Sequence, residues 1–198
     1  MDGSGVLAET LADPLPHPLA SSQGEGAHPR LRTKWRLSNV DPILRKWLLN
    51  QERAWEQFAP ETDIVSVQGI REDGVCRRYI AEFQCNGLIR VQGREPEVAD
   101  LFGVGIYFGD NHLRKAEPLG MCWLLGPENT FHPNIRHPIV CPGHVWTGIT
   151  LKDLVYQVYS ILTYQNMSLD DCLSEEAAAW ARDNRQRFPI DTRPLKRR

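Results

Sequence analysis

The chain has 198 residues, of which 41% are hydrophobic and 24% charged, and its formal net charge is −2. This length and composition are typical of one globular domain with an additional tail. The small net charge excludes a general electrostatic attraction to nucleic acid or anionic lipid. No apolar run approaches the roughly 18 residues of a membrane-spanning helix. We therefore expect neither nucleic acid nor a membrane as a partner.

The five cysteines are odd in number and form no CxxC pair. A disulfide framework is therefore not expected, and a reducing cytoplasm is the default compartment. The N-terminal stretch contains the acidic Asp2 and no basic start, which does not fit a secretory signal peptide. These features predict a cytoplasmic protein.

The two ends of the chain differ from its middle in composition. Residues 1–33 are rich in Gly, Ser, Pro and Ala, with only isolated apolar residues, so we expect a disordered or loosely ordered tail there. A folded domain is predicted over residues 34–190. Residues 191–198, a basic tail, are expected to form a solvated terminus.

The first predicted element is an amphipathic helix. Asp41 is a good N-cap and Pro42 suits the first helical position. The helix also contains the basic residues Arg45, Lys46 and Arg53. Without further evidence, a cluster of charges such as this favours a solvated face. The apolar residues that fall close to one helical stripe are Ile43, Trp47, Leu48, Trp55 and Phe58.

Four β-like runs follow, over residues 62–70, 76–91, 101–109 and 117–126. Each is rich in β-branched or aromatic residues and is bounded by turn residues, which predicts a four-stranded antiparallel meander. Residues 128–150 contain several Pro and Gly, so we expect a mostly irregular loop there.

Two helices are predicted after this loop. The first begins near Thr150 and places six apolar residues on one face. The second begins after Ser174, a good N-cap, with Glu175 and Glu176 at its positive end. The apolar residues of the helix that begins near Thr150 are Leu151, Leu154, Val155, Val158, Ile161 and Leu162. Helices and strands that are segregated in this way indicate an α+β fold.

The loop sequence FHPNIRHPIVCPGHVW, residues 131–146, has three possible interpretations. It contains four potential zinc ligands: His132, His137, Cys141 and His144. Their spacings do not match the common zinc pattern of two close pairs, and the intervening prolines stiffen the chain. A second interpretation is a loop that merely packs against the sheet, with Cys141 as a small hydrophobe. Long irregular loops in compact domains are usually functional, which weakens that interpretation.

The third interpretation is a nucleophilic cysteine. A free thiol has a pKa of about 8.5, so a few per cent of thiolate at neutral pH suffices for exchange with a thioester. Attack of an amine on that thioester needs a donor for the oxyanion, which an Asn amide can supply. Asn134 lies seven residues before Cys141 and directly follows Pro133.

The order of motifs resembles the ubiquitin-conjugating enzyme family. FHPNI, a cysteine, a Trp, the helix TLKDLVYQVYSILTYQN and the acidic turn DDCLSEEAAAW follow one another as in that family. GREPEVADLFGVGIYF and FGDNHLRKAEP are similar to its third strand and the loop beyond it. The resemblance covers about residues 37–187. Pro142 after the cysteine and Cys172 after the acidic pair depart from the usual pattern and favour divergent bacterial members, from operons that encode a ubiquitin-like modification system.

The resemblance implies a fold and a role for each matching residue. The fold would be ubiquitin-conjugating-enzyme-like, with an N-terminal helix, the meander, an active-site loop and C-terminal helices. Cys141 would carry a modifier as a thioester, and Asn134 would stabilise the oxyanion or hold the loop. His132 would be structural, and Asp171, or alternatively Asp170, would orient or desolvate an incoming lysine amine.

The resemblance also implies partners. The chain would accept a ubiquitin-like modifier from an activating enzyme and transfer it to a target protein without a cofactor or metal, and some such bacterial systems act against phage. Arg45, Lys46 and Arg53 would face the activating enzyme. His137 and His144 have no counterpart in the family; one could support Cys141 as a base, as in a cysteine hydrolase. The main alternative is an inactive module that only binds a modifier or partner protein.

Overall fold

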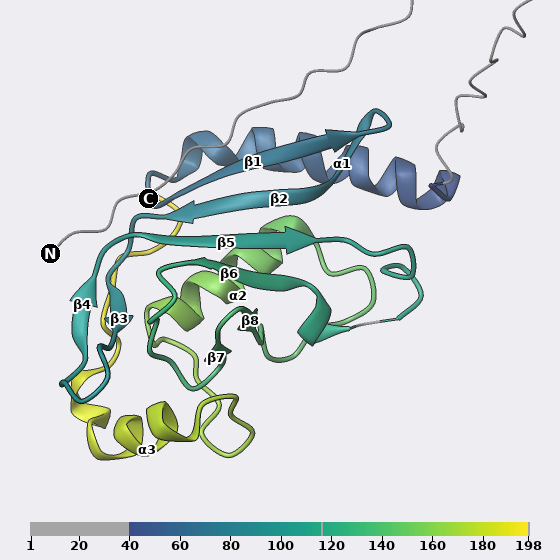
Figure 1. Cartoon of the computed structure of the whole chain (residues 1–198). Helices are drawn as coiled ribbons and strands as arrows, with labels where there is room; N and C mark the ends of the chain where they lie inside the picture. The colour runs from purple at the N-terminus through teal and green to yellow at the C-terminus, as the bar shows by residue number, and fades with distance from the viewer. Residues whose placement is uncertain (1–39, 116, 198) are drawn as a thin grey trace, which may run out of the picture. The chain divides into compact units, whose positions relative to one another are not determined.

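The structure is a computed structural model that describes residues 40–115 and 117–197. The predicted N-terminal tail lies outside the described residues. Figure 1 shows the order of elements along the chain. The helices and 3-10 turns are α1 (Pro42–Phe58), η1 (Ala59–Glu61), η2 (Pro118–Gly120), α2 (Leu151–Leu162), α3 (Glu175–Asp183) and η3 (Arg185–Arg187). The strands are β1 (Val65–Glu72), β2 (Val75–Phe83), β3 (Gly87–Ile89), β4 (Glu97–Ala99), β5 (Phe102–Tyr107), β6 (Cys122–Gly126), β7 (Ile135–Arg136) and β8 (Ile139–Val140).

Six of the strands form one antiparallel sheet in the order β1-β2-β5-β6-β8-β7, and β3 pairs with β4 separately. The first hairpin turns at Asp73 and Gly74, which both have positive φ, as a two-residue hairpin loop requires. Antiparallel pairing was predicted and is confirmed. The structure has more strands than the four predicted. β3 is separate from β2 within the predicted run 76–91 and pairs with β4, while β7 and β8 lie inside the segment expected to be irregular and extend the sheet beyond β6.

The predicted helix caps are present. The Asp41 carboxylate accepts hydrogen bonds from the backbone N–H groups of Ile43 and Leu44, and Ser174 accepts one from the N–H of Ala177. The apolar face predicted for α2 is buried along its whole length. One residue of the α1 stripe was wrongly predicted, since Ile43 is 72% exposed. The buried stripe begins at Leu44, which lies about 100° around the helix from Ile43, and continues through the predicted Leu48.

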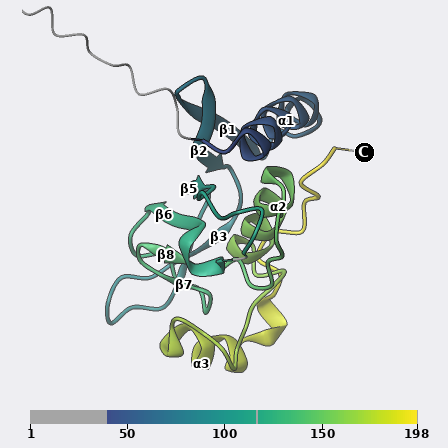
Figure 2. The ribbon, with the colours of Figure 1, turned by 90° about the vertical axis from the view of Figure 1, so that its right-hand side faces the viewer.

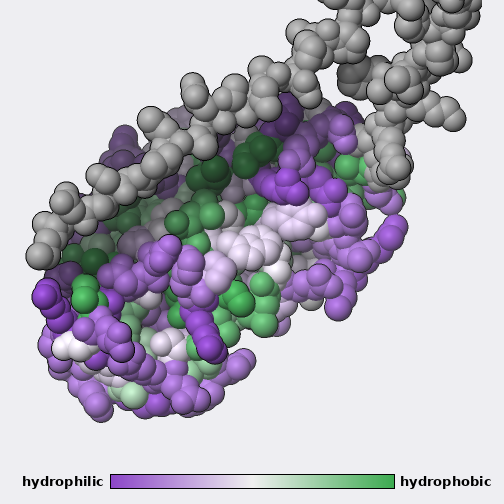
Figure 3. Space-filling view, in the orientation of Figure 1, coloured by the Kyte–Doolittle hydropathy of each residue, from purple (hydrophilic) through white to green (hydrophobic). Residues whose placement is uncertain are grey.

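Helices α1 and α2 cover one face of the sheet, as the turned view in Figure 2 shows. Their apolar stripes and the inward side chains of β2, β5 and β6 form the main core. On the face drawn in Figure 3, hydrophobic side chains lie between hydrophilic margins. Exposed large apolar residues of the sheet include Ile70, Ile80 and Leu125. None of the described helices combines the length and the apolar content that crossing a bilayer would require.

A second, smaller core lies under α3. Tyr164 packs there against the edge of the His132 ring and is stacked on Phe188, with ring centroids 4.3 and 4.5 Å apart respectively. The Tyr164 hydroxyl donates to the carbonyl of Phe131. This cluster fixes the beginning of the 131–146 loop to the C-terminal half of the chain.

The C-terminal segment differs from the solvated terminus expected of it. Leu195 is buried in the main core, and the backbone N–H of Arg197 donates to the carbonyl of Glu61 at 2.7 Å. Asp191 is buried too, where it accepts from the Asn86 N–H and pairs with Arg193, which holds its pKa below the ordinary value despite its burial. Basic composition alone suggested a free tail, and the single apolar Leu195 was the signal against it.

Candidate functional site

Cys141 follows β8 directly and opens onto a cavity. Its side chain is partly exposed, and its backbone N–H donates to the carbonyl of Asn134 at 2.9 Å. The cavity has a volume of about 660 Å³. Its lining residues are Pro118, Leu119, Asn134, Cys141, Gly143, His144, Asn166, Met167, Ser168, Asp171 and Leu173. Cys141 is therefore a partly exposed residue beside a cavity large enough for a few residues of extended chain.

The local sequence explains why the chain leaves the sheet at this point. Val140 still pairs with Cys122 of β6, and both side chains are buried. Pro142 then removes a backbone donor, and Gly143 adopts a φ of 82°, which most side chains avoid. The resulting turn carries the chain from the sheet to the rim of the cavity, with Cys141 at its beginning.

Asn134 ties the two sides of the cavity together. Its side chain is almost fully buried, with 3% relative exposure. Its Oδ1 accepts from the backbone N–H of Ser168 at 2.8 Å, and its Nδ2 donates to the carbonyl of Cys141 at 3.4 Å. The amide thus holds the cysteine turn and the 167–173 segment in place. The longer Nδ2 contact is the weaker of the two bonds.

His132 is a buried, neutral side chain. Its Nδ1 accepts a hydrogen bond from the backbone N–H of Asn134 at 3.0 Å, so the ring proton resides on Nε2. Burial lowers the pKa of His132 to about 3, although the backbone of Asn166 opposes the shift. His132 is therefore a buried residue whose ring is bonded within the loop, and the role that the family resemblance implies for it stays a prediction.

The two candidate acidic residues differ in position. Asp171 lines the cavity, and its backbone N–H donates to the Ser168 hydroxyl at 3.3 Å. Asp170 does not line the cavity; its carboxylate is fully exposed and lies 3.8 Å from the guanidinium of Arg182. Of the two, Asp171 is therefore the residue that lines the cavity of Cys141.

The loop histidines are separated in the same way. His144 lines the cavity with Cys141, whereas His137 lies exposed in the turn between β7 and β8 and does not line it. Among the described residues, no three His, Cys, Asp or Glu side chains come together in a way that could hold a metal ion. His132, with Nδ1 already occupied, points into the core rather than to the cavity.

The basic residues of α1 lie away from the cavity. Lys46 and Arg53 are exposed, while Arg45 donates to the carbonyl of Asp73 at 3.0 Å in the first hairpin turn. None of the three lines the cavity of Cys141. They are available on the surface of the helix, with Arg45 the most constrained.

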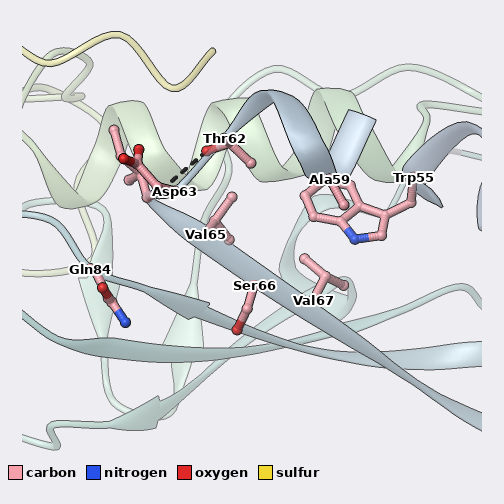
Figure 4. Close-up of a pocket in the computed structure, with 9 residues that line it drawn as sticks. Trp55, Ala59, Thr62, Asp63, Val65, Ser66, Val67 and Gln84 are labelled. Atoms are coloured by element: carbon pink, nitrogen blue, oxygen red, sulfur yellow. Dashed lines mark hydrogen bonds between the residues drawn. The ribbon is translucent and has the colours of Figure 1, made fainter. Parts of the chain in front are cut away.

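A second cavity, of about 350 Å³, lies between the end of α1 and β1 (Figure 4). Trp55, Val65 and Val67 give it an apolar wall, and Asp63 stands at its rim. The Asp63 carboxylate is paired with Arg197 at 2.7 Å, which lowers its pKa. The described residues that line this cavity include no thiol, no hydroxyl–imidazole pair and no unpaired carboxylate, so we assign no chemistry to the cavity.

Sequence reasoning missed two residues that shape the site. Ser168 supplies the N–H that Asn134 binds, and Gln157 of α2 donates from Nε2 to the carbonyl of His144 at 3.0 Å. Both act across long stretches of chain through single hydrogen bonds. No local pattern marks such contacts, although the polar Gln157 within an otherwise apolar stretch of helix was a weak signal.

No protein-family model matches the sequence, and no curated protein is detectably similar to it. Among solved structures, the chain is similar to the E2 domain of a Toxoplasma gondii ubiquitin conjugating enzyme, with 19% sequence identity. The match covers 71% of this chain and 92% of the Toxoplasma chain, at a TM-score of 0.42. A TM-score of this size assigns neither family nor function, so the proposals below depend on the site itself.

Proposed function

We propose that this chain is a ubiquitin-like modifier conjugating enzyme of the transferase class. Cys141 accepts the C-terminus of a modifier as a thioester from an activating enzyme and passes it to an amine of a target protein. One observation supports this most strongly: a partly exposed cysteine, Cys141, and an acidic residue, Asp171, line the same cavity. That is the arrangement that amine attack on a stored acyl group needs.

Both steps are exchanges at one carbonyl carbon. In charging, the Cys141 thiolate attacks the donor thioester, forming a new C–S bond and expelling the donor thiolate. In discharge, the neutral amine nitrogen attacks the same carbon, forming an amide as the Cys141 C–S bond breaks and the thiolate leaves. The nitrogen gives up one proton, which passes to a base of the site or to water. Neither step requires a cofactor.

The other cysteines are poor candidates for the nucleophile. Cys76, Cys85 and Cys122 are buried, and burial raises the pKa of Cys85 and of Cys122 to about 12. The thiolate of these two is therefore scarce at neutral pH. Cys172 is partly exposed but does not line the cavity. Cys141 is the thiol that combines exposure with the cavity.

The remaining parts of the proposal concern setting and partners. The exposed cations of α1, Lys46 and Arg53 with Arg45, would contact the activating enzyme. All five cysteines are free, which suits a reducing compartment such as the cytoplasm. A bacterial modification operon, and a part in defence against phage, follow from the family resemblance alone.

The test is a charging assay. The chain is incubated with ATP, activating enzymes and ubiquitin or ubiquitin-like proteins encoded beside its gene, and adducts are followed on non-reducing gels. We expect an adduct that reducing agent removes, that is lost in Cys141→Ser and that is kept in the matched control Cys172→Ser. If binding to the cognate modifier occurs without any adduct, the chain is a binding module and the transferase proposal is wrong.

A further inference from the structure

His144 and Cys141 are brought to the same cavity by a four-residue turn. Pro142 is buried and Gly143 has a φ of 82°, and the chain bends at residues 143–144, so that Cys141 and His144 both line the cavity. His137, four positions before Cys141, lies outside it. The turn thus selects one of the two exposed histidines of the loop.

Gln157 fixes the position of His144 from outside the cavity. Its Nε2 donates to the His144 carbonyl at 3.0 Å, from the adjacent helix α2. The Gln157 Oε1 is buried and has no hydrogen-bond partner among the described residues. A buried acceptor without a partner is costly, and the bond to the His144 carbonyl is the one hydrogen bond that the Gln157 side chain forms with the described residues.

The charges around His144 are few. Of the described residues that line the cavity, the other ionisable side chains are Cys141, on the same turn, and Asp171, on the segment before α3. The η2 side contributes Pro118 and Leu119, and the remaining lining groups are amides, a hydroxyl and apolar side chains. Histidine is the side chain that normally gains or loses a proton near neutral pH.

We propose that His144 is the general base of the discharge step, with a primary amine of the target as its substrate; this deepens the proposed function and rests on it. As the amine nitrogen bonds to the thioester carbonyl carbon, one of its protons passes to a ring nitrogen of neutral His144. The C–S bond breaks, the electron pair stays on the sulfur of Cys141, and the imidazolium later returns its proton to water. The ammonium form of the amine first loses a proton to water, and Asp171 orients the neutral amine before the transfer to His144.

The experiment uses a small thioester probe, so that it does not depend on the modifier. The chain with Cys172→Ser is loaded at Cys141 with the 2-mercaptoethanesulfonate thioester of acetyl-glycylglycine, and single-turnover discharge to free L-lysine is followed by intact mass. We expect His144→Gln to load normally and to discharge about 100-fold more slowly near pH 8. The matched control His137→Gln should discharge at the parent rate.

The pH profile separates catalysis from a structural effect. Only neutral imidazole can accept the proton, so the ratio of parent to His144→Gln rates should shrink towards one from about pH 8 to about pH 5, the range in which histidines titrate. A ratio that stays constant with pH, or equal rates for His144→Gln and His137→Gln, overturns the proposal. Loading that fails at Cys141 itself contradicts the proposed function instead.

Gln157→Leu tests the positioning role. This variant keeps the shape of the side chain, removes the bond to the His144 carbonyl and removes the unpaired Oε1, so we expect an unchanged or raised melting temperature. Discharge should slow by about tenfold while loading is unchanged, because a misplaced base loses efficiency. A folded Gln157→Leu with the parent discharge rate contradicts the positioning role.

Discussion

The two cavities differ in what their polar groups are bound to. In the cavity of Cys141, backbone groups hold the polar side chains of Asn134 and Ser168, whereas the side chains of Cys141, Asp171 and His144 form no hydrogen bond or ion pair with the described residues. In the cavity beside β1, the carboxylate of Asp63 is already paired with Arg197. Both are concave and partly apolar. A concave shape therefore does not distinguish a reactive site from a structural one. Polar side chains without a hydrogen-bond or ion-pair partner do distinguish the two.

The largest effect is expected at Asn134, where the two roles implied by the family resemblance can be separated. Asn134→Ala should leave charging of Cys141 largely intact and slow discharge by about 100- to 1,000-fold, the usual cost of losing an oxyanion donor. To act in this way, the Nδ2 of Asn134 must give up its long hydrogen bond to the Cys141 carbonyl and donate to the oxyanion instead. The measurement is single-turnover charging and discharge.

A loop-holding role of Asn134 predicts a different pattern. Removal of the amide leaves the Ser168 N–H without its partner, which costs about 1–3 kcal/mol of unfolding free energy. Chemical denaturation of Asn134→Ala measures that loss. Equal loss of charging and discharge, accompanied by destabilisation, contradicts the oxyanion role and leaves the amide as a clamp across the cavity.

The next prediction concerns Asp171, which lines the same cavity. Asp171→Ala should slow discharge by about tenfold to 100-fold without affecting charging, because the carboxylate meets only the incoming amine. The slowing should be greatest at low pH, where fewer amines are free. Asp170→Ala is the matched control, since its carboxylate lies outside the cavity and pairs weakly with Arg182. A pH-independent effect, or an equal effect of both variants, contradicts the proposal that Asp171 receives the incoming amine.

His132 is expected to make the free energy of unfolding depend on pH. Its folded-state pKa of about 3 lies below the value near 6.5 of an unfolded histidine. Protons therefore bind preferentially to the unfolded chain as pH falls below about 6.5, and this destabilises the fold. Between pH 7 and pH 5 the loss should be about 2 kcal/mol.

The matched variant is His132→Asn, which does not titrate and keeps an acceptor close to the Asn134 N–H. Its unfolding free energy, measured by urea denaturation, should change less over this pH range than that of the parent chain. Parallel pH profiles of the two proteins contradict a buried, neutral His132.

The predictable parts of this chain are those governed by neighbouring residues. Asp41 and Ser174 marked helix starts because a cap acts within one turn, and the apolar face of α2 repeats at helical spacing. The pair β7 and β8 escaped notice because two-residue strands contain no periodicity. Ile43 was misplaced because neighbouring apolar residues, Ile43 and Leu44, offered two similar stripes and only packing decides between them.

The sequence named candidate residues for the site but not their geometry. Cys141, Asn134 and Asp171 were all named from sequence, yet the Asn134–Ser168 bond that spans the cavity joins residues 34 apart. His137 and His144 are equivalent as sequence features. Only the turn at Gly143 and the bond from Gln157 distinguish them, and neither has a local signature.

The smallest effect is expected in the second cavity. Asp63→Asn should leave charging and discharge unchanged, because its carboxylate is committed to Arg197 at the chain's C-terminal end and faces no reactive group. Since the pair is exposed, little stability should be lost either. The variant is compared with the parent chain in the acyl-loading assay and by its melting temperature. A slowed discharge in Asp63→Asn contradicts the distinction between a cavity with free polar groups and one whose groups are already paired.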